Sequence, residues 1–149
     1  MPTTNNKKYK VCASGIIALI YIAQYLGMPM YLTCFTYQFY HANIFHLAAN
    51  LYALWIVRFD RRNILPAYII SVVAYLLFPH AIGLSGVLMA VIGIYANKKV
   101  WKYYIVFSVV TFFVPNIAFG VHTTCFVSGF IYGKIQRKID EYRAAYTGR

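Results

Sequence analysis

The sequence predicts an all-α, polytopic membrane protein in which six transmembrane helices form one bundle. The first observation behind this prediction is composition: hydrophobic residues make up 61% of the 149 residues and charged residues only 11%. An ordinary soluble domain carries roughly 25% charged residues. A soluble chain of this size needs polar side chains over most of its surface, so the composition favours a lipid bilayer as the surrounding medium.

The second observation is a series of six apolar stretches, which together predict a single domain over residues 1–149. Several are shorter than the ~20 residues that a full span requires, because polar residues interrupt the apolar count at the start of the second and fourth. The segments before and after the series, 1–10 and 136–149, are expected to be short basic tails. The expected helices cover residues 11–26, 43–57, 64–78, 84–96, 101–114 and 117–135.

The third observation is the placement of charge. All 14 lysines and arginines lie before the first stretch, between the second and third, around the junction of the fourth and fifth, or towards the end of the sixth and beyond it. Six spans place all of these segments on one side of the membrane, and basic loops stay cytoplasmic. We therefore expect a multi-pass protein of a prokaryotic plasma membrane with both termini in the cytoplasm. The net charge of +11 then reflects topology rather than nucleic-acid binding, since the basic residues form short clusters between apolar runs.

The acidic residues narrow the chemistry. Asp60, Asp140 and Glu141 all fall on the expected cytoplasmic side, so no carboxylate is expected within the membrane. This argues against aspartyl proteases, carboxylate-based proton carriers and a Ser-His-Asp triad. It also argues against a zinc protease, which needs the glutamate of His-Glu-x-x-His. The three cysteines have no metal-site spacing, and we expect neither a metal nor an organic cofactor.

A candidate nucleophile and a candidate base lie on two helices that enter the membrane from the same face. Ser85, in the run Gly83-Leu84-Ser85-Gly86, opens the fourth helix, where free backbone N–H groups and the helix dipole stabilise a developing negative charge. His122 lies about five residues inside the outer end of the sixth helix. A histidine in hydrocarbon usually has a partner or a function. The alternative interpretation of His122 is a purely structural hydrogen bond.

Small residues on the fourth and sixth helices predict that these helices pack closely. Residues of this kind at such spacings let helix backbones approach one another within a membrane. They are Gly86, Ala90 and Gly93 on the fourth helix, and Cys125, Gly129 and Gly133 on the sixth.

The second helix carries two more polar side chains of interest. His46 and Asn50 are four residues apart, hence on one helical face, and both start from the same outer side as Ser85. Two neutral donors that converge near a serine are what an oxyanion hole requires. The alternative is a polar pair that only holds helices together.

The combined pattern resembles the rhomboid family of intramembrane serine proteases, in a minimal six-helix form of prokaryotic type. The resemblance rests on His-x4-His-x3-Asn (His41, His46 and Asn50), Gly-x-Ser-Gly around Ser85 and a lone His122, in this order. It implies that Ser85 is the nucleophile and His122 the general base. His46, Asn50 and the Ser85 backbone N–H would form the oxyanion hole, and His41 would shape the water-accessible mouth.

The resemblance also implies an activity and its partners. The expected protein is a serine endopeptidase that cleaves transmembrane segments of single-pass membrane proteins near the outer face. Its partners would be these substrates and the lipid bilayer, without metal or nucleic acid. Two positions depart from the family: Met89 replaces a tyrosine that stacks on the histidine in well-known bacterial members, and Cys125 replaces a glycine. The loop between the first two helices also lacks the family's Trp-Arg pair.

Two alternatives stay open at this point. One is a catalytically inactive rhomboid-like protein that binds or chaperones other proteins, although such relatives typically lack the serine or the histidine. The other is a small transporter with a path lined by histidines. All four histidines lie towards the outer half, which leaves the inner half of such a path without polar side chains. They are His41, His46, His80 and His122.

Overall fold

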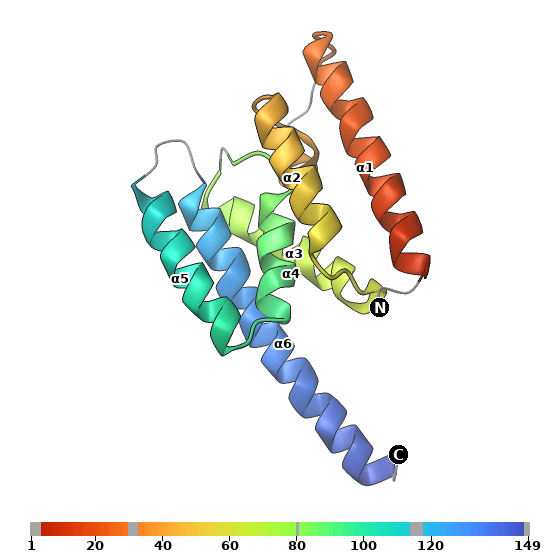
Figure 1. The fold of residues 1–149 in the computed structure, drawn as a ribbon, viewed down its shortest axis with the longest axis vertical. Coiled ribbons are helices and arrows are strands. Elements are labelled where there is room, and N and C mark those ends of the chain that lie inside the picture. The colour runs from red at the N-terminus through yellow and green to blue at the C-terminus, as the bar shows by residue number, and fades with distance from the viewer. Residues whose placement is uncertain (1–3, 30–32, 80, 114–117, 148–149) are drawn as a thin grey trace.

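The computed structural model describes residues 4–29, 33–79, 81–113 and 118–147. Within these residues the chain is all-helical, with six α-helices, one short 3-10 helix and no strand (Figure 1). The predicted all-α, six-helix architecture is confirmed. The elements are α1 (Thr4–Tyr25), η1 (Tyr37–Phe39), α2 (Ile44–Ile56), α3 (Arg61–Leu77), α4 (Ser85–Ile94), α5 (Lys98–Phe112) and α6 (Phe119–Thr147).

Three of the helices begin where a short polar side chain caps the first turn. Asn43 accepts a hydrogen bond from the backbone N–H of His46 at the start of α2. Asp60 precedes α3 and Asn97 precedes α5, and each caps its helix in the same way. A side-chain oxygen in this position satisfies one of the N–H groups that a helix leaves unpaired at its start. Local sequence therefore sets these three boundaries.

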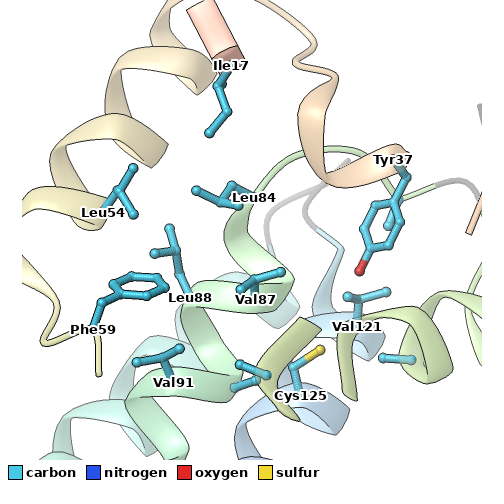
Figure 2. Close-up of a cluster of buried hydrophobic side chains, with 14 of the residues drawn as sticks. Ile17, Tyr37, Leu54, Phe59, Leu84, Val87, Leu88, Val91, Val121 and Cys125 are labelled. Carbon is cyan, nitrogen blue, oxygen red and sulfur yellow. The ribbon is translucent and has the colours of Figure 1, made fainter. Parts of the chain in front are cut away.

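Helix α4 is the centre of the bundle. Seven of its residues are buried, and α4 packs against α6, α3, η1 and α2. Figure 2 shows apolar side chains on two sides of α4: Ile17 of α1 lies on the side of Leu84, and Val121 of α6 lies on the other side, near Tyr37. A residue at the start of α4 is therefore held from several sides.

Glycines bring the backbones of α4 and α6 into direct contact. A Cβ atom on Gly129 would overlap the carbonyl oxygen of Ala90, and a Cβ on Gly133 would overlap the carbonyl oxygen of Ile94. A Cβ on Gly93 would likewise overlap the carbonyl oxygen of Phe126. The predicted close packing of these two helices is confirmed.

Gly86 is an exception to the predicted stripe of small residues. A Cβ on Gly86 would lie 2.8 Å from the Tyr37 hydroxyl and 2.9 Å from Ser71 Oγ, with Val121 of α6 slightly farther at 3.2 Å. Gly86 therefore leaves room chiefly for η1 and α3. The prediction that Gly86 serves the contact between α4 and α6 is confirmed only in part, through Val121. Helical spacing alone does not say which neighbour each side of α4 meets.

The ends of the first and last helices differ from the predicted ones. Helix α6 continues to Thr147 instead of ending at residue 135, and it projects beyond the bundle (Figure 1). Helix α1 begins at Thr4 rather than at residue 11. Hydropathy misses both extensions because charged residues break an apolar run without breaking a helix; Lys, Arg and Glu are good helix formers. The projecting end is tied back by Arg62, which donates two 2.9 Å hydrogen bonds to the Asp140 carboxylate.

Large apolar side chains are exposed on the outer faces of the helices. Leu19 of α1 is 68% exposed, Leu65 of α3 is 64% exposed and Phe112 of α5 is 64% exposed. In the part of the chain that the structure describes, no helix combines the length and the apolar character that crossing a membrane requires.

Candidate functional site

A serine and a histidine meet where α4 and α6 begin. Ser85 is the first residue of α4, and His122 lies in the first turn of α6. The Nε2 atom of His122 lies 2.8 Å from Ser85 Oγ, which is hydrogen-bonding distance. His122 is buried and Ser85 is half-buried. This distance suits transfer of the hydroxyl proton to the imidazole.

The start of α4 leaves backbone donors beside Ser85. The first N–H groups of an α-helix have no partner within the helix, and the residue that precedes α4 is Leu84, whose side chain has no acceptor to cap them. The positive end of the helix dipole lies at the same place. The environment of Ser85 thus favours a negative charge close to its Oγ.

Gly83 connects this helix start to α2. Its φ of +105° lies in the left-handed region, which glycine adopts at little cost. A Cβ on Gly83 would lie 2.6 Å from Cε1 and 2.7 Å from Nε2 of His46, and 3.3 Å from Nδ2 of Asn50. The His46 ring and the Asn50 amide therefore both touch the residue that lies two positions before Ser85.

The hydrogen bonds that His46 and Asn50 already make leave each side chain with one N–H donor near Gly83. Nδ1 of His46 accepts a hydrogen bond from the backbone N–H of Ala42 at 3.4 Å, which assigns the ring proton to Nε2, the atom beside Gly83. Asn50 Nδ2 donates one hydrogen to the carbonyl oxygen of His46 at 3.0 Å, and an amide nitrogen has a second hydrogen. The structure brings two neutral donors to the turn that precedes Ser85.

His41 is buried against the His46 ring and does not line a water-accessible opening. Its side chain is 0% exposed, its Nδ1 is 3.2 Å from the carbonyl oxygen of Phe39, and its ring meets the His46 ring edge-on with centroids 5.2 Å apart. The expectation that His41 shapes a water-accessible opening is wrong. The chain between η1 and α2 turns this side chain inward, where it supports the His46 ring.

Gln24 is a supporting residue that the sequence reasoning missed. Its Nε2 donates to the backbone carbonyl of His41 at 2.9 Å, and its Oε1 accepts from the His41 N–H at 3.2 Å. This pair of bonds attaches the end of α1 to the segment that carries His41 and His46. The signal in the sequence is a single carboxamide inside the mostly apolar stretch of residues 11–26.

Met89 and Phe107 complete the surroundings. Met89 is partly buried and packs against both hydrophobic clusters of the protein. The aromatic ring beside His122 comes instead from Phe107 of α5, with ring centroids 6.1 Å apart and planes tilted by 40°. No local pattern marks Phe107 among so many aromatic residues. His80, one of the four histidines of the transporter alternative, lies outside the described residues.

The fold and the site together define a helical bundle with a Ser-His pair at the adjoining ends of two closely packed helices. A family model described as "Rhomboid domain" matches residues 29–140, which is well over half of the chain and includes every site residue described above except Gln24. No curated protein matches the sequence. The chain belongs to the rhomboid family. This family consists of membrane proteins and is typically one of intramembrane serine proteases.

Proposed function

We propose that this protein is an intramembrane serine endopeptidase that cleaves transmembrane segments of other membrane proteins. The observation that carries the proposal is the 2.8 Å hydrogen bond between Ser85 Oγ and His122 Nε2. An unassisted serine hydroxyl is a weak nucleophile, and an adjacent general base activates it. Family membership supports the same reaction class.

In the proposed reaction Ser85 Oγ attacks the carbonyl carbon of the scissile peptide bond while His122 Nε2 takes the hydroxyl proton. The carbonyl oxygen becomes an oxyanion, which His46 Nε2–H, Asn50 Nδ2–H and the backbone N–H groups at the start of α4 stabilise. The intermediate then collapses: the C–N bond breaks, and His122 gives its proton to the leaving amine. Water, deprotonated by His122, attacks the acyl ester; the ester C–O bond breaks, His122 returns the proton to Ser85 Oγ, and the new carboxyl terminus leaves.

The pair works without a carboxylate in this proposal. Asp60 caps the start of α3, and Asp140 and Glu141 lie in the projecting part of α6. Within the described residues, no carboxylate forms a hydrogen bond with the His122 ring, whose Nε2 meets Ser85 and whose Nδ1 has no partner. The orientation of His122 must therefore come from groups other than an acid.

The setting that we propose for this reaction is a prokaryotic plasma membrane, with both termini in the cytoplasm. The exposed apolar side chains on α1, α3 and α5 suit contact with lipid. In Figure 1 the start of α1, the end of α2, the start of α5 and the end of α6 point towards the same side. The basic residues cluster at these ends, and basic segments stay in the cytoplasm. The Ser85–His122 pair then lies towards the outer face.

A fluorophosphonate, which forms an adduct with activated serines, tests the proposal. We expect purified protein in detergent or liposomes to be labelled at Ser85 and to cleave a single-pass model substrate. Ser85→Ala should remove both the label and the cleavage, and His122→Ala should reduce both nearly as far. Serines without a neighbouring base serve as internal controls that stay unlabelled: Ser14, Ser71, Ser108 and Ser128.

The same experiment separates the proposal from its alternatives. A rhomboid-like protein that binds without cleaving, or a transporter, would give no serine adduct. Cleavage that persists in pure Ser85→Ala protein would show that another group performs the chemistry.

A further inference from the structure

His122 is held by hydrogen bonding at only one of its two ring nitrogens. Nε2 meets Ser85, while Nδ1 has no hydrogen-bond partner among the described residues, although the atom is buried. A general base is usually oriented by a third group. No hydrogen bond at Nδ1 therefore fixes the ring, so contacts with neighbouring side chains must orient the buried imidazole.

A series of aromatic rings on α5, in which each ring contacts the next, leads to His122. The rings belong to Trp101, Tyr104 and Phe107, which are spaced three residues apart and therefore follow one another along the helix. Ring centroids are 6.0 Å apart between Trp101 and Tyr104, and 6.4 Å apart between Tyr104 and Phe107. The final step, from Phe107 to His122, is 6.1 Å. All three separations fall within the ~4.5–7 Å range of favourable aromatic pairs.

The first two rings of this series, those of Trp101 and Tyr104, pack against α6, the helix that carries His122. Tyr104 stacks on Phe126 with centroids 3.6 Å apart and planes within 6°. Trp101 meets Phe126 edge-on at 5.0 Å and Phe130 edge-on at 5.1 Å. These contacts hold α5, and with it Phe107, in place relative to α6. The Phe107 ring therefore has a defined position beside the imidazole of His122.

We infer that Phe107 is a positioning residue for His122: its ring limits the tilt of the imidazole and keeps Nε2 directed at Ser85. The inference rests on the proposed function, because it concerns the orientation of the base in that reaction. Phe107 is 37% exposed, so a change there alters this contact without opening a cavity in the core. The ring does not donate or accept a proton.

Three variants on α5 test this role. Phe107→Leu removes the ring and keeps an apolar side chain, and Phe107→Tyr keeps the ring. Phe112→Leu is the matched control, because the Phe112 ring contacts Phe113 and Phe119. The measurements are the second-order rate of fluorophosphonate labelling at Ser85, kcat and KM for a transmembrane substrate, and the thermal unfolding temperature.

We expect Phe107→Leu to lower the labelling rate and kcat by about tenfold, which corresponds to the loss of one aromatic contact. KM and thermal unfolding should stay close to those of the wild type. Phe107→Tyr and Phe112→Leu should both keep near wild-type rates. If Phe107→Leu does not fold, Phe107→Met, which fills a similar volume without a ring, carries the same expectation.

Two outcomes would overturn the inference alone. One is a wild-type protein that forms the serine adduct together with a Phe107→Leu variant that reacts equally fast. The other is an equal loss in Phe107→Leu and Phe112→Leu that follows their thermal unfolding, which would assign Phe107 to general packing of α5. A wild-type protein without any serine adduct would instead overturn the proposed function, and the inference with it.

Discussion

Gly83 packs directly against the imidazole of His46, so closely that a Cβ on Gly83 would lie only 2.7 Å from His46 Nε2. The positive φ of Gly83, +105°, adds a second reason for glycine at this position. Only a residue without a Cβ atom therefore fits between the turn that precedes Ser85 and the donors on α2.

Gly83→Ala should therefore reduce proteolysis by on the order of a hundredfold, because a shift of about 1 Å in a catalytic group costs that much. Gly27→Ala is a matched control: Gly27 also has a positive φ, +74°, but a Cβ there would meet nothing within 4 Å. Both variants strain the backbone, and only the first displaces His46. Equal activity in the two variants would show that the contact between Gly83 and His46 has no role in catalysis.

Gly129→Ala should separate α4 from α6, because the added Cβ overlaps the carbonyl oxygen of Ala90 and a backbone cannot move aside cheaply. We expect a lower thermal unfolding temperature and a loss of serine labelling, since the Ser85–His122 contact depends on this approach. Gly15→Ala on α1, where a Cβ would meet nothing within 4 Å, should leave both properties unchanged or raise stability slightly. Wild-type stability and labelling in Gly129→Ala would contradict the packing described for these helices.

Removal of the α2 donors should have a graded effect on cleavage. Loss of one donor from a preorganised oxyanion hole typically costs ~10²–10³ in rate. Asn50→Ala should cost less than this, because His46 and the backbone N–H groups of α4 remain. The double variant His46→Ala, Asn50→Ala should be nearly inactive while remaining folded by circular dichroism. A folded and fully active double variant would mean that the two side chains only hold α2 in place.

The proposed orientation predicts which cysteines react from outside intact cells. Cys34, in the partly exposed segment before η1, should react with a membrane-impermeant thiol reagent. A cysteine at the exposed position 98, made by Lys98→Cys, should react only after the cells are permeabilised; this change leaves the Asn97 cap of α5 intact. Cys12→Ser removes the exposed thiol of α1. The opposite labelling pattern would reverse the orientation and place the Ser85–His122 pair towards the cytoplasm.

The projecting part of α6 should loosen at acid pH. The hydrogen bonds and charge of Arg62 hold the pKa of the Asp140 carboxyl below its usual value. Because this pKa is lowered in the folded state, the ion pair contributes fully at neutral pH and is lost as pH falls through the lowered value. Hydrogen exchange in residues 138–145 should therefore speed up at acid pH relative to exchange in the rest of α6, and Asp140→Asn should abolish this relative change. As both side chains are exposed, cleavage at neutral pH should be unaffected.

Local sequence determined a large part of this protein. Apolar stretches marked the six helices, because an apolar run of more than about ten residues is typical of a helix and too long for most strands. Asn43 and Asn97 set helix starts through a bond to a backbone N–H three residues away, which needs no tertiary contact. The order and spacing of Ser85, His122 and the α2 pair, His46 and Asn50, were also recognisable in the sequence.

Tertiary structure decided which of these residues meet and in what manner. Ser85 and His122 stand 37 residues apart in the chain, and their contact exists because glycines let α4 and α6 approach. The burial of His41 and the neighbours of Gly86 follow from how η1, α2 and α3 pack around α4. Phe107 became a site neighbour only through the rings that attach α5 to α6. Such contacts depend on the relative rotation of whole helices, a quantity that spacing along a single helix does not contain.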